Sequence, residues 1–193
     1  MSPLPRRRRL TDELLELSGI PNVDVVEPAP NLGRTPGRIL ELTPSSYTGA
    51  DSDPDAVAAV RRVFGLRAKL IEADAAETGL ADESADLVIG EAMLTMQGEK
   101  AKNAIVAEAA RILRPGGRYA IHELGLVPEE LADGVKDEIR QSLARAIRVN
   151  ACPLTLGEWT AVFEANGFLK PPRLRPRRWL CCSRVEFFPM KDS

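Results

Sequence analysis

Short apolar runs alternate along the chain with segments whose apolar residues recur at helical spacing. Runs of roughly four to eight apolar residues bounded by turn residues predict buried strands, and apolar positions three or four residues apart predict helices. The runs predict strands at 23–27, 46–51, 68–73, 85–90 and 119–124, and the helical spacing predicts helices at 36–42, from 54 onward, and at 100–113, 129–149 and 156–166. Strands that alternate with helices in this way predict an α/β fold.

The clearest helical pattern lies at 100–113, where Ile105, Ala109 and Ile112 share one face. The sequence Arg-Pro-Gly-Gly that follows is typical of a helix end. Residues 1–20 predict an N-terminal arm or helix, and residues 168–193 predict antiparallel edge strands or a tail. The whole chain, 1–193, therefore predicts a single domain with a Rossmann-like, doubly wound, mainly parallel sheet, helices on both faces and an antiparallel C-terminal edge.

Composition narrows the class of protein. The 193 residues are 44% hydrophobic and 28% charged, with a formal net charge of −2, which is typical of a soluble globular protein without a strongly basic surface. We therefore expect no nucleic-acid partner, and we interpret the basic runs at 6–9 and 170–184 as solvated segments. No apolar run approaches the ~18 residues that span a bilayer, and no apolar stretch follows the N-terminal arginines as a secretory signal would require. These features predict a cytoplasmic protein with no membrane partner.

Cysteine and histidine are scarce. The chain has three cysteines, Cys152, Cys181 and Cys182, and a single histidine, His122. An odd cysteine count with two neighbours fits neither a disulfide framework nor a zinc site. We expect a reduced protein without a metal site.

Candidate chemistry lies where the predicted strands end, because ligands of doubly wound sheets bind at the carboxyl ends of the strands. Asp51 ends the second predicted strand, and Asp74 follows the third. A carboxylate in the first position can accept hydrogen bonds from both hydroxyls of a ribose. An acid at the end of the neighbouring strand, such as Asp74 after the third predicted strand, can accept a hydrogen bond from the amino group of an adenine. Both aspartates also fit ordinary turn positions, which aspartate favours.

Several motifs, taken together in this order and spacing, resemble those of class I S-adenosylmethionine-dependent methyltransferases. They are Tyr-Thr-Gly-Ala-Asp-Ser-Asp-Pro at 47–54, Glu-Ala-Asp-Ala at 72–75, Ala-Asp-Leu-Val-Ile-Gly at 85–90 and Leu-Arg-Pro-Gly-Gly-Arg at 113–118. The resemblance covers roughly residues 23–168. The stretches 90–96 and 121–124 are also similar to a bacterial subgroup known only as methyltransferase-domain proteins.

The resemblance implies a role for each matching position. Asp51 would hold the cofactor ribose, Asp74 with the Ala75 backbone would meet the adenine, and Gly90 with Glu91 would face the methionine part and the substrate. The loop after the first strand would carry the cofactor carboxylate and sugar on backbone amides, helped by the following helix N-terminus. The acid and the three alternating glycines of that loop correspond to Glu27, Ala29, Asn31 and Gly33.

This loop departs from the family pattern, because Ala29 and Asn31 replace two of the three glycines and prolines flank Ala29. Glycine permits close backbone approach and positive φ, whereas proline removes an amide donor and fixes φ. The departure leaves open an alternative, a non-catalytic relative with a weakened or lost cofactor site that acts as a binding or regulatory module. A nicotinamide-dependent oxidoreductase also uses a second-strand acid, but it needs the same glycines and leaves the Arg-Pro-Gly-Gly motif unexplained.

The activity that the resemblance implies is methyl transfer from S-adenosylmethionine to an unidentified acceptor, which we expect to be a small molecule. Because the sulfonium is a good leaving group, the protein mainly supplies alignment and desolvation. Where the acceptor must lose a proton, Glu91 and His122 are the candidate catalytic residues. His122 also fits a buried strand histidine without a catalytic role. The oligomeric state, including a homodimer, stays open.

Overall fold

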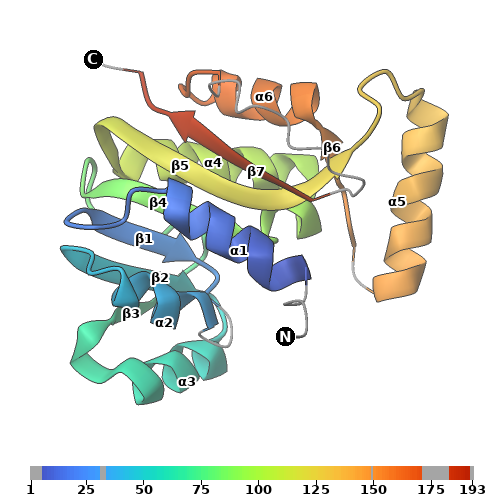
Figure 1. Cartoon of the computed structure of the whole chain (residues 1–193). Coiled ribbons are helices and arrows are strands. Elements are labelled where there is room, and N and C mark those ends of the chain that lie inside the picture. The colour runs from blue at the N-terminus through green and yellow to red at the C-terminus, as the bar shows by residue number, and fades with distance from the viewer. Residues whose placement is uncertain (1–5, 31–33, 149, 171–182, 192–193) are drawn as a thin grey trace.

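The computed structural model describes residues 6–30, 34–148, 150–170 and 183–191, and its strands form one central sheet (Figure 1). The strand order is β3-β2-β1-β4-β5-β6, all parallel, with β7 antiparallel beside β5. The strands are β1 (Asp24–Pro28), β2 (Ser46–Asp51), β3 (Lys69–Glu72), β4 (Ala85–Glu91), β5 (Leu113–Leu126), β6 (Leu154–Thr155) and β7 (Ser183–Pro189). The strand order reverses between β1 and β4, so the prediction of a doubly wound sheet with an antiparallel C-terminal strand is confirmed.

Helices cover both faces of this sheet. They are α1 (Arg6–Leu17), α2 (Arg34–Glu41), α3 (Pro54–Phe64), α4 (Glu99–Ile112), α5 (Asp133–Ile147) and α6 (Leu156–Ala165), with short 3-10 turns η1 (Gly65–Arg67) and η2 (Leu94–Met96). Figure 1 shows α1 and α2 in front of the sheet and α4 behind it. Local sequence explains two starts: Asp53 accepts the amide of Asp55 before α3, and Thr155 with Glu158 forms a capping box at α6.

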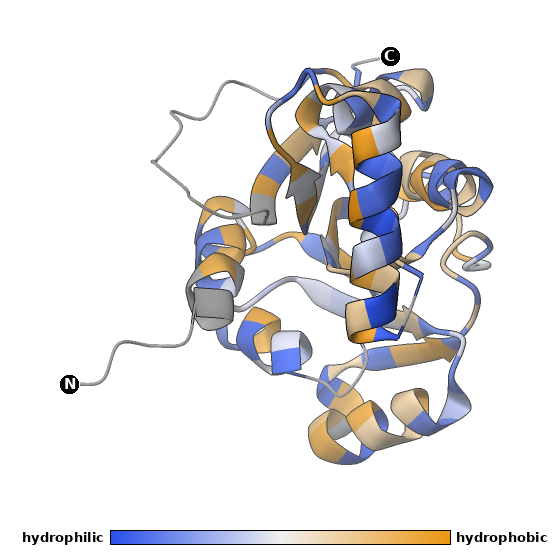
Figure 2. Cartoon of the chain, turned by 90° about the vertical axis from the view of Figure 1, so that its right-hand side faces the viewer, coloured by the Kyte–Doolittle hydropathy of each residue, from blue (hydrophilic) through white to orange (hydrophobic). Residues whose placement is uncertain are grey.

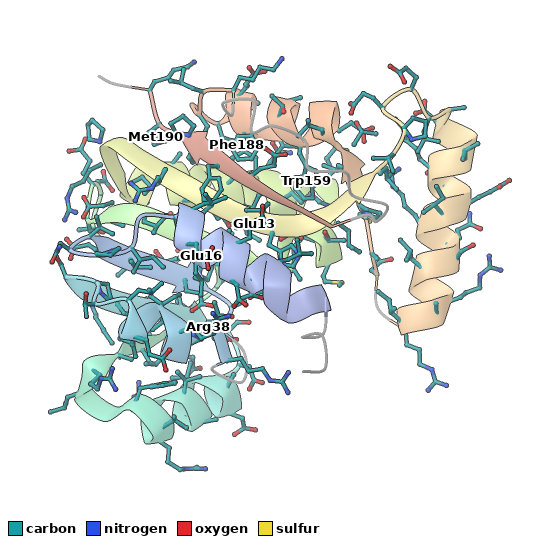
Figure 3. The ribbon with its side chains drawn as sticks, viewed as in Figure 1. Glu13, Glu16, Arg38, Trp159, Phe188 and Met190 are labelled. Atoms are coloured by element: carbon teal, nitrogen blue, oxygen red, sulfur yellow. The ribbon has the colours of Figure 1, made fainter. Side chains whose placement is uncertain are left out.

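The core is divided by the sheet into two clusters. On the α1, α2 and α3 side, Leu14 and Leu15 of α1 pack with Val25, Leu87, Ile89 and Phe187. On the α4 and α6 side, Tyr119 and Phe168 pack edge-on against Phe163, and Phe188 stacks on Phe163 at 3.8 Å. Figure 3 shows Phe188 on β7 and Trp159 on α6 at this side of the molecule. Because β7 contributes Phe187 to one cluster and Phe188 to the other, it joins both cores.

Most boundaries agree with the predictions within two residues, the short strand β6 was not predicted, and three differences are larger. β5 begins at Leu113 directly after α4, because Leu113 pairs with Ala85 and the Arg-Pro-Gly-Gly segment continues the strand through a register shift. The helix predicted at 129–149 begins only at Asp133, after a cis Val127–Pro128 bond and a turn. One antiparallel strand, β7, replaces the predicted pair as far as the described residues extend, and Cys181 and Cys182 lie outside them.

Helix α5 is set apart from the rest of the fold. None of its described residues is buried, and its contact with the body includes an ion pair between Lys136 and Glu158 of α6 at 2.8 Å. Figures 1 and 2 agree in placing α5 beyond the carboxyl ends of the parallel strands, and Figure 2 shows hydrophilic residues over much of its surface. This helix therefore stands on the side of the sheet where ligands of such folds bind.

Candidate functional site

Glu91 is the centre of a hydrogen-bonded cluster at the carboxyl end of β4. Its carboxylate accepts the hydroxyl of Thr11 from α1 at 2.5 Å and that of Thr35 from α2 at 2.8 Å. On β5, His122 is in register with Glu91, and its Nδ1 lies 3.4 Å from the same carboxylate. Burial alone would raise the pKa of Glu91, but the hydrogen bonds from His122, Thr11 and Thr35 outweigh it and hold the pKa at about 2. Glu91 is therefore an anion whose position is fixed from three sides.

The same contacts orient the only histidine of the chain. A carboxylate is purely an acceptor, so His122 must present a protonated Nδ1 to Glu91. The lone pair of the neutral ring then lies on Nε2. His122 is only 5% exposed, which protects this arrangement from water. A base oriented by a carboxylate is the arrangement used for proton removal in many enzymes.

Glu27 occupies the corresponding position at the end of β1 and is also buried. The hydroxyl of Tyr47 on β2 donates to Glu27 at 2.7 Å. Burial raises the pKa of Glu27 to about 8, a rise opposed by the Tyr47 hydrogen bond and supported by the charges of Glu91 and Asp51. Burial and the Glu27 charge raise the pKa of Tyr47 as well. Glu27 is thus mainly a neutral acid near pH 7.

Asp51 ends β2 as the sequence predicts, and only 8% of it is exposed. Its carboxylate accepts the amide of Asp53 at 3.0 Å, while its carbonyl accepts the amide of Ala73 from the segment after β3. Since the Asp51 and Glu91 charges both act on Glu27, the three acids lie at one edge of the sheet. Such a set of carboxyl groups suits a cationic ligand that also carries hydroxyl groups.

The loop after β1 keeps the backbone shape of a glycine loop at its first position. Ala29 has a φ of 54°, which lies in the left-handed region that favours glycine. Its amide donates to the carbonyl of Ala50 at 2.7 Å, and Pro30 lies close enough to Gly49 that a Cβ there would come within 3.2 Å of it. Asn31 and Gly33 lie outside the described residues. The alanine therefore adopts a conformation that favours glycine, at a cost of order 1 kcal/mol.

The turn after β3 is shaped by Asp74 itself. Its side chain accepts the amide of Ala76 at 2.7 Å, and its carbonyl accepts the amide of Glu77 at 3.0 Å. Asp74 is exposed and Ala75 is half-buried. Asp74 thus follows β3, as the sequence predicts, and its carboxyl group reaches the surface.

Gly90 is explained by packing. A Cβ on this residue would come within 3.0 Å of the Tyr119 hydroxyl and 3.2 Å of its ring, on the α4 side of the sheet. The glycine that the sequence assigns to cofactor contact therefore makes room for a buried tyrosine.

Glu123 lies next to His122 on β5, with its side chain on the opposite face of the sheet from His122. It was not identified from the sequence as a site residue. It is 2% exposed and accepts the amides of Met93, Leu94 and Thr95 at 2.8 to 3.0 Å and the Thr95 hydroxyl at 2.6 Å. These bonds fix the segment that directly follows Glu91. An acid inside an apolar strand was the available signal, because a buried carboxylate requires several donors.

The sequence also did not predict the roles of three residues that donate hydrogen bonds to these acids: Thr11, Thr35 and Tyr47. Each reaches an acid far away in the sequence, so local pattern gives no sign of the contact. Across the described ranges, no cluster of His, Cys, Asp and Glu side chains suitable for a metal ion is found. None of the helices in that part of the chain has the length and apolar character of a membrane span.

The acids at the ends of β1, β2 and β4 of this doubly wound sheet fit the resemblance to class I methyltransferases that the sequence motifs carry. Comparison with known proteins agrees, since residues 25–117 match the family model described as a methyltransferase domain. An uncharacterized protein of Haemophilus influenzae is 32% identical over 170 residues, which cover 85% of this chain and 66% of the relative. The chain therefore spans just under two thirds of that relative's length.

Solved structures share the fold at low sequence identity. The YcgJ protein of Bacillus subtilis has a TM-score of 0.78 at 12% identity, over 96% of this chain and 99% of its own. A SAM-dependent methyltransferase of Methanosarcina mazei has a TM-score of 0.71 at 15% identity, over 93% and 98%. The 1,6-didemethyltoxoflavin-N1-methyltransferase of Burkholderia thailandensis, solved with its substrate and S-adenosylhomocysteine, has a TM-score of 0.70 at 19% identity, over 96% and 78%. Residues 25–117 thus match a methyltransferase domain, and these structures share the fold of the chain.

Proposed function

We propose that this chain transfers a methyl group from S-adenosylmethionine to a small-molecule acceptor. The observation that supports the proposal most is the meeting of Glu27, Asp51 and Glu91 at one edge of a methyltransferase fold. The Glu91 anion suits a positive sulfonium, and the carboxyl oxygens of the set suit two ribose hydroxyls. The Burkholderia relative in this fold acts on a small molecule, which favours an acceptor of that kind.

Each part of the cofactor has a candidate partner. Asp51 would accept the ribose hydroxyls, and Asp74 with the Ala75 backbone would meet the adenine. The segment from Ala29 through Asn31 to Gly33 would hold the carboxylate end, while Gly90 and Glu91 would face the methionine chain. The positive φ of Ala29 supports this assignment, because the alanine adopts at the first glycine position a conformation that favours glycine.

When bound, S-adenosylmethionine supplies an electrophilic methyl group and a good leaving group. The chain's own work is to align the acceptor, exclude water and, where the acceptor carries a proton, remove it. We assign that removal to Nε2 of His122, with Glu91 holding the ring by Nδ1 and stabilising the imidazolium that forms. Glu123 keeps the Met93–Thr95 segment beside them in place.

The odd cysteine count supports a reducing compartment, the cytoplasm, as the place of action.

The experiment is calorimetric titration of the purified chain with S-adenosylmethionine and S-adenosylhomocysteine. We expect micromolar binding, reduced at least tenfold in Asp51→Asn and unchanged in the exposed control Asp55→Asn. Absence of binding up to millimolar concentration would refute the proposal and favour the non-catalytic alternative. Binding that Asp51→Asn leaves unchanged would refute the ribose assignment.

A further inference from the structure

A buried carboxylate outside the described cluster holds the turn after β3. Glu108 lies on α4, and only 8% of it is exposed. Its Oε1 accepts both the amide of Thr78 at 2.8 Å and the hydroxyl of Thr78 at 2.5 Å. The amide of Leu80 in turn donates to the Thr78 hydroxyl oxygen at 3.3 Å. One side chain of α4 thereby fixes a residue four positions after Asp74.

Arg111, one turn further along α4, fixes the carboxylate itself. Its Nε donates to Oε2 of Glu108 and its Nη2 to Oε1, both at 2.8 Å, and it also pairs with Asp82. The hydrogen bonds from Arg111 and Thr78 hold the pKa of Glu108 at about 2 despite burial. Glu108 is therefore ionised at neutral pH, and charge-assisted bonds of this kind are the strong ones.

The turn that carries Asp74 has its own internal hydrogen bonds, its Ala75 and Ala76 pack on the core, and hydrogen bonds at its two ends join it to the neighbouring elements. At the first end, the amide of Ala73 donates to the carbonyl of Asp51 at 3.0 Å. At the other end stands the Thr78–Glu108 contact. Beneath the turn lies a small cavity of about 10 Å³, lined among others by Pro28, Ala75 and Glu108.

We propose that Glu108 is a positioning residue for adenine selection: by holding Thr78 it fixes the turn on which the Asp74 carboxylate and the Ala75 backbone meet the base. This inference rests on the proposed function, which assigns that turn to the adenine. Asp74 as an acceptor distinguishes the amino group of adenine from the carbonyl oxygen of hypoxanthine, provided that the turn keeps its position. Glu108 does not touch the cofactor, so its removal changes selectivity more than overall binding.

The test compares the affinities of S-adenosylhomocysteine and S-inosylhomocysteine, which differ at one edge of the base: adenine has an amino group at C6 and an acceptor N1, whereas hypoxanthine has a carbonyl oxygen at C6 and a protonated N1. For the unaltered chain we expect a preference for the adenine compound of about tenfold or more, as for one hydrogen bond to a charged group. Glu108→Ala should reduce the preference to within about twofold, whereas Glu108→Gln should keep most of it, because an amide oxygen still accepts from Thr78. The exposed Glu99→Ala on the same helix is the matched control and should keep the full preference.

Other outcomes overturn the inference in distinguishable ways. If Glu108→Ala weakens both ligands by the same factor, the residue has a structural role only. If Glu108→Ala does not fold, Thr78→Val removes one of the two bonds to the carboxylate, and an unchanged preference in that variant refutes the positioning role. Equal binding of both ligands by the unaltered chain refutes the placing of Asp74 at the adenine. Failure to bind either ligand refutes the proposed function itself.

Discussion

The buried acid at the end of β1 makes the pH dependence of folding a sharp test of the site. Burial beside Tyr47 raises the pKa of Glu27 from 4.5 to about 8. In the unfolded chain the same carboxyl group ionises near its ordinary pKa. Between pH 4.5 and 8 the folded state therefore holds a proton that the unfolded state has released, and the free energy of unfolding must fall as the pH rises. At about 1.4 kcal/mol per pKa unit, the full loss across this window is up to about 5 kcal/mol.

Glu27→Gln removes this titration and keeps the shape of the side chain and an acceptor for the Tyr47 hydroxyl. Urea unfolding of both proteins at several values between pH 5 and 8.5 measures the effect. We expect the difference in unfolding free energy to grow in favour of the variant as the pH rises, and to level off above pH 8. The exposed Glu41→Gln on α2 is the control and should follow the unaltered chain. Parallel curves for Glu27→Gln and the unaltered chain would show that Glu27 does not keep its proton on folding.

Three further predictions follow from the packing and the charges of the site. Glu91→Gln should lower the free energy of unfolding above pH 4.5 by up to about 3 kcal/mol and remove the stability that the unaltered chain loses between pH 4.5 and 2, because the pKa of Glu91 is lowered to about 2; acid unfolding followed by circular dichroism measures this, and identical acid transitions would contradict it. Phe163→Ala should cost about 3–5 kcal/mol in urea unfolding, since the ring is fully buried and stacks on Phe188, and a cost below about 1 kcal/mol would mean that the aromatic cluster is not closely packed. Gly90→Ala should cost about 1–3 kcal/mol through its clash with Tyr119, and adding Tyr119→Phe should restore part of the loss; strictly additive losses in thermal unfolding would refute the contact.

Much of the fold follows from local pattern. The strand at 46–51 and the helix beginning at Pro54 match the structure at those boundaries, because turn residues bound the apolar run and Asp53 caps the helix. β5 extends further than its apolar core at 119–124 because pairing with β4 recruits Leu113 and the residues after it. Pairing of this kind depends on a neighbour far away in the sequence, which a local pattern does not contain.

Part of the candidate site could also be predicted from the sequence, and part of it could not. Acids at strand ends are visible in the sequence, since a doubly wound sheet brings these ends together, and Asp51 and Glu91 lie where this rule places them. Their partners are not visible, because Thr11 and Glu91 are 80 residues apart and meet only when α1 covers the sheet. The glycine pattern was misleading in one respect, since Ala29 takes up a positive φ that a non-glycine residue adopts only under strain.

The position of β7 also sets an order for folding. This strand pairs with β5 along its length, and its Phe187 belongs to the same cluster as Leu14 and Leu15 of α1. The helix nearest the N-terminus thus completes its core against a strand nearest the C-terminus. During synthesis, α1 can pack on Val25, Leu87 and Ile89 of β1 and β4 as soon as these strands pair, but the part of its apolar face beside Phe187 stays uncovered until β7 has been made. The α1 helix also carries Thr11, so the final packing of α1 against β7 also supports the contact between Thr11 and Glu91.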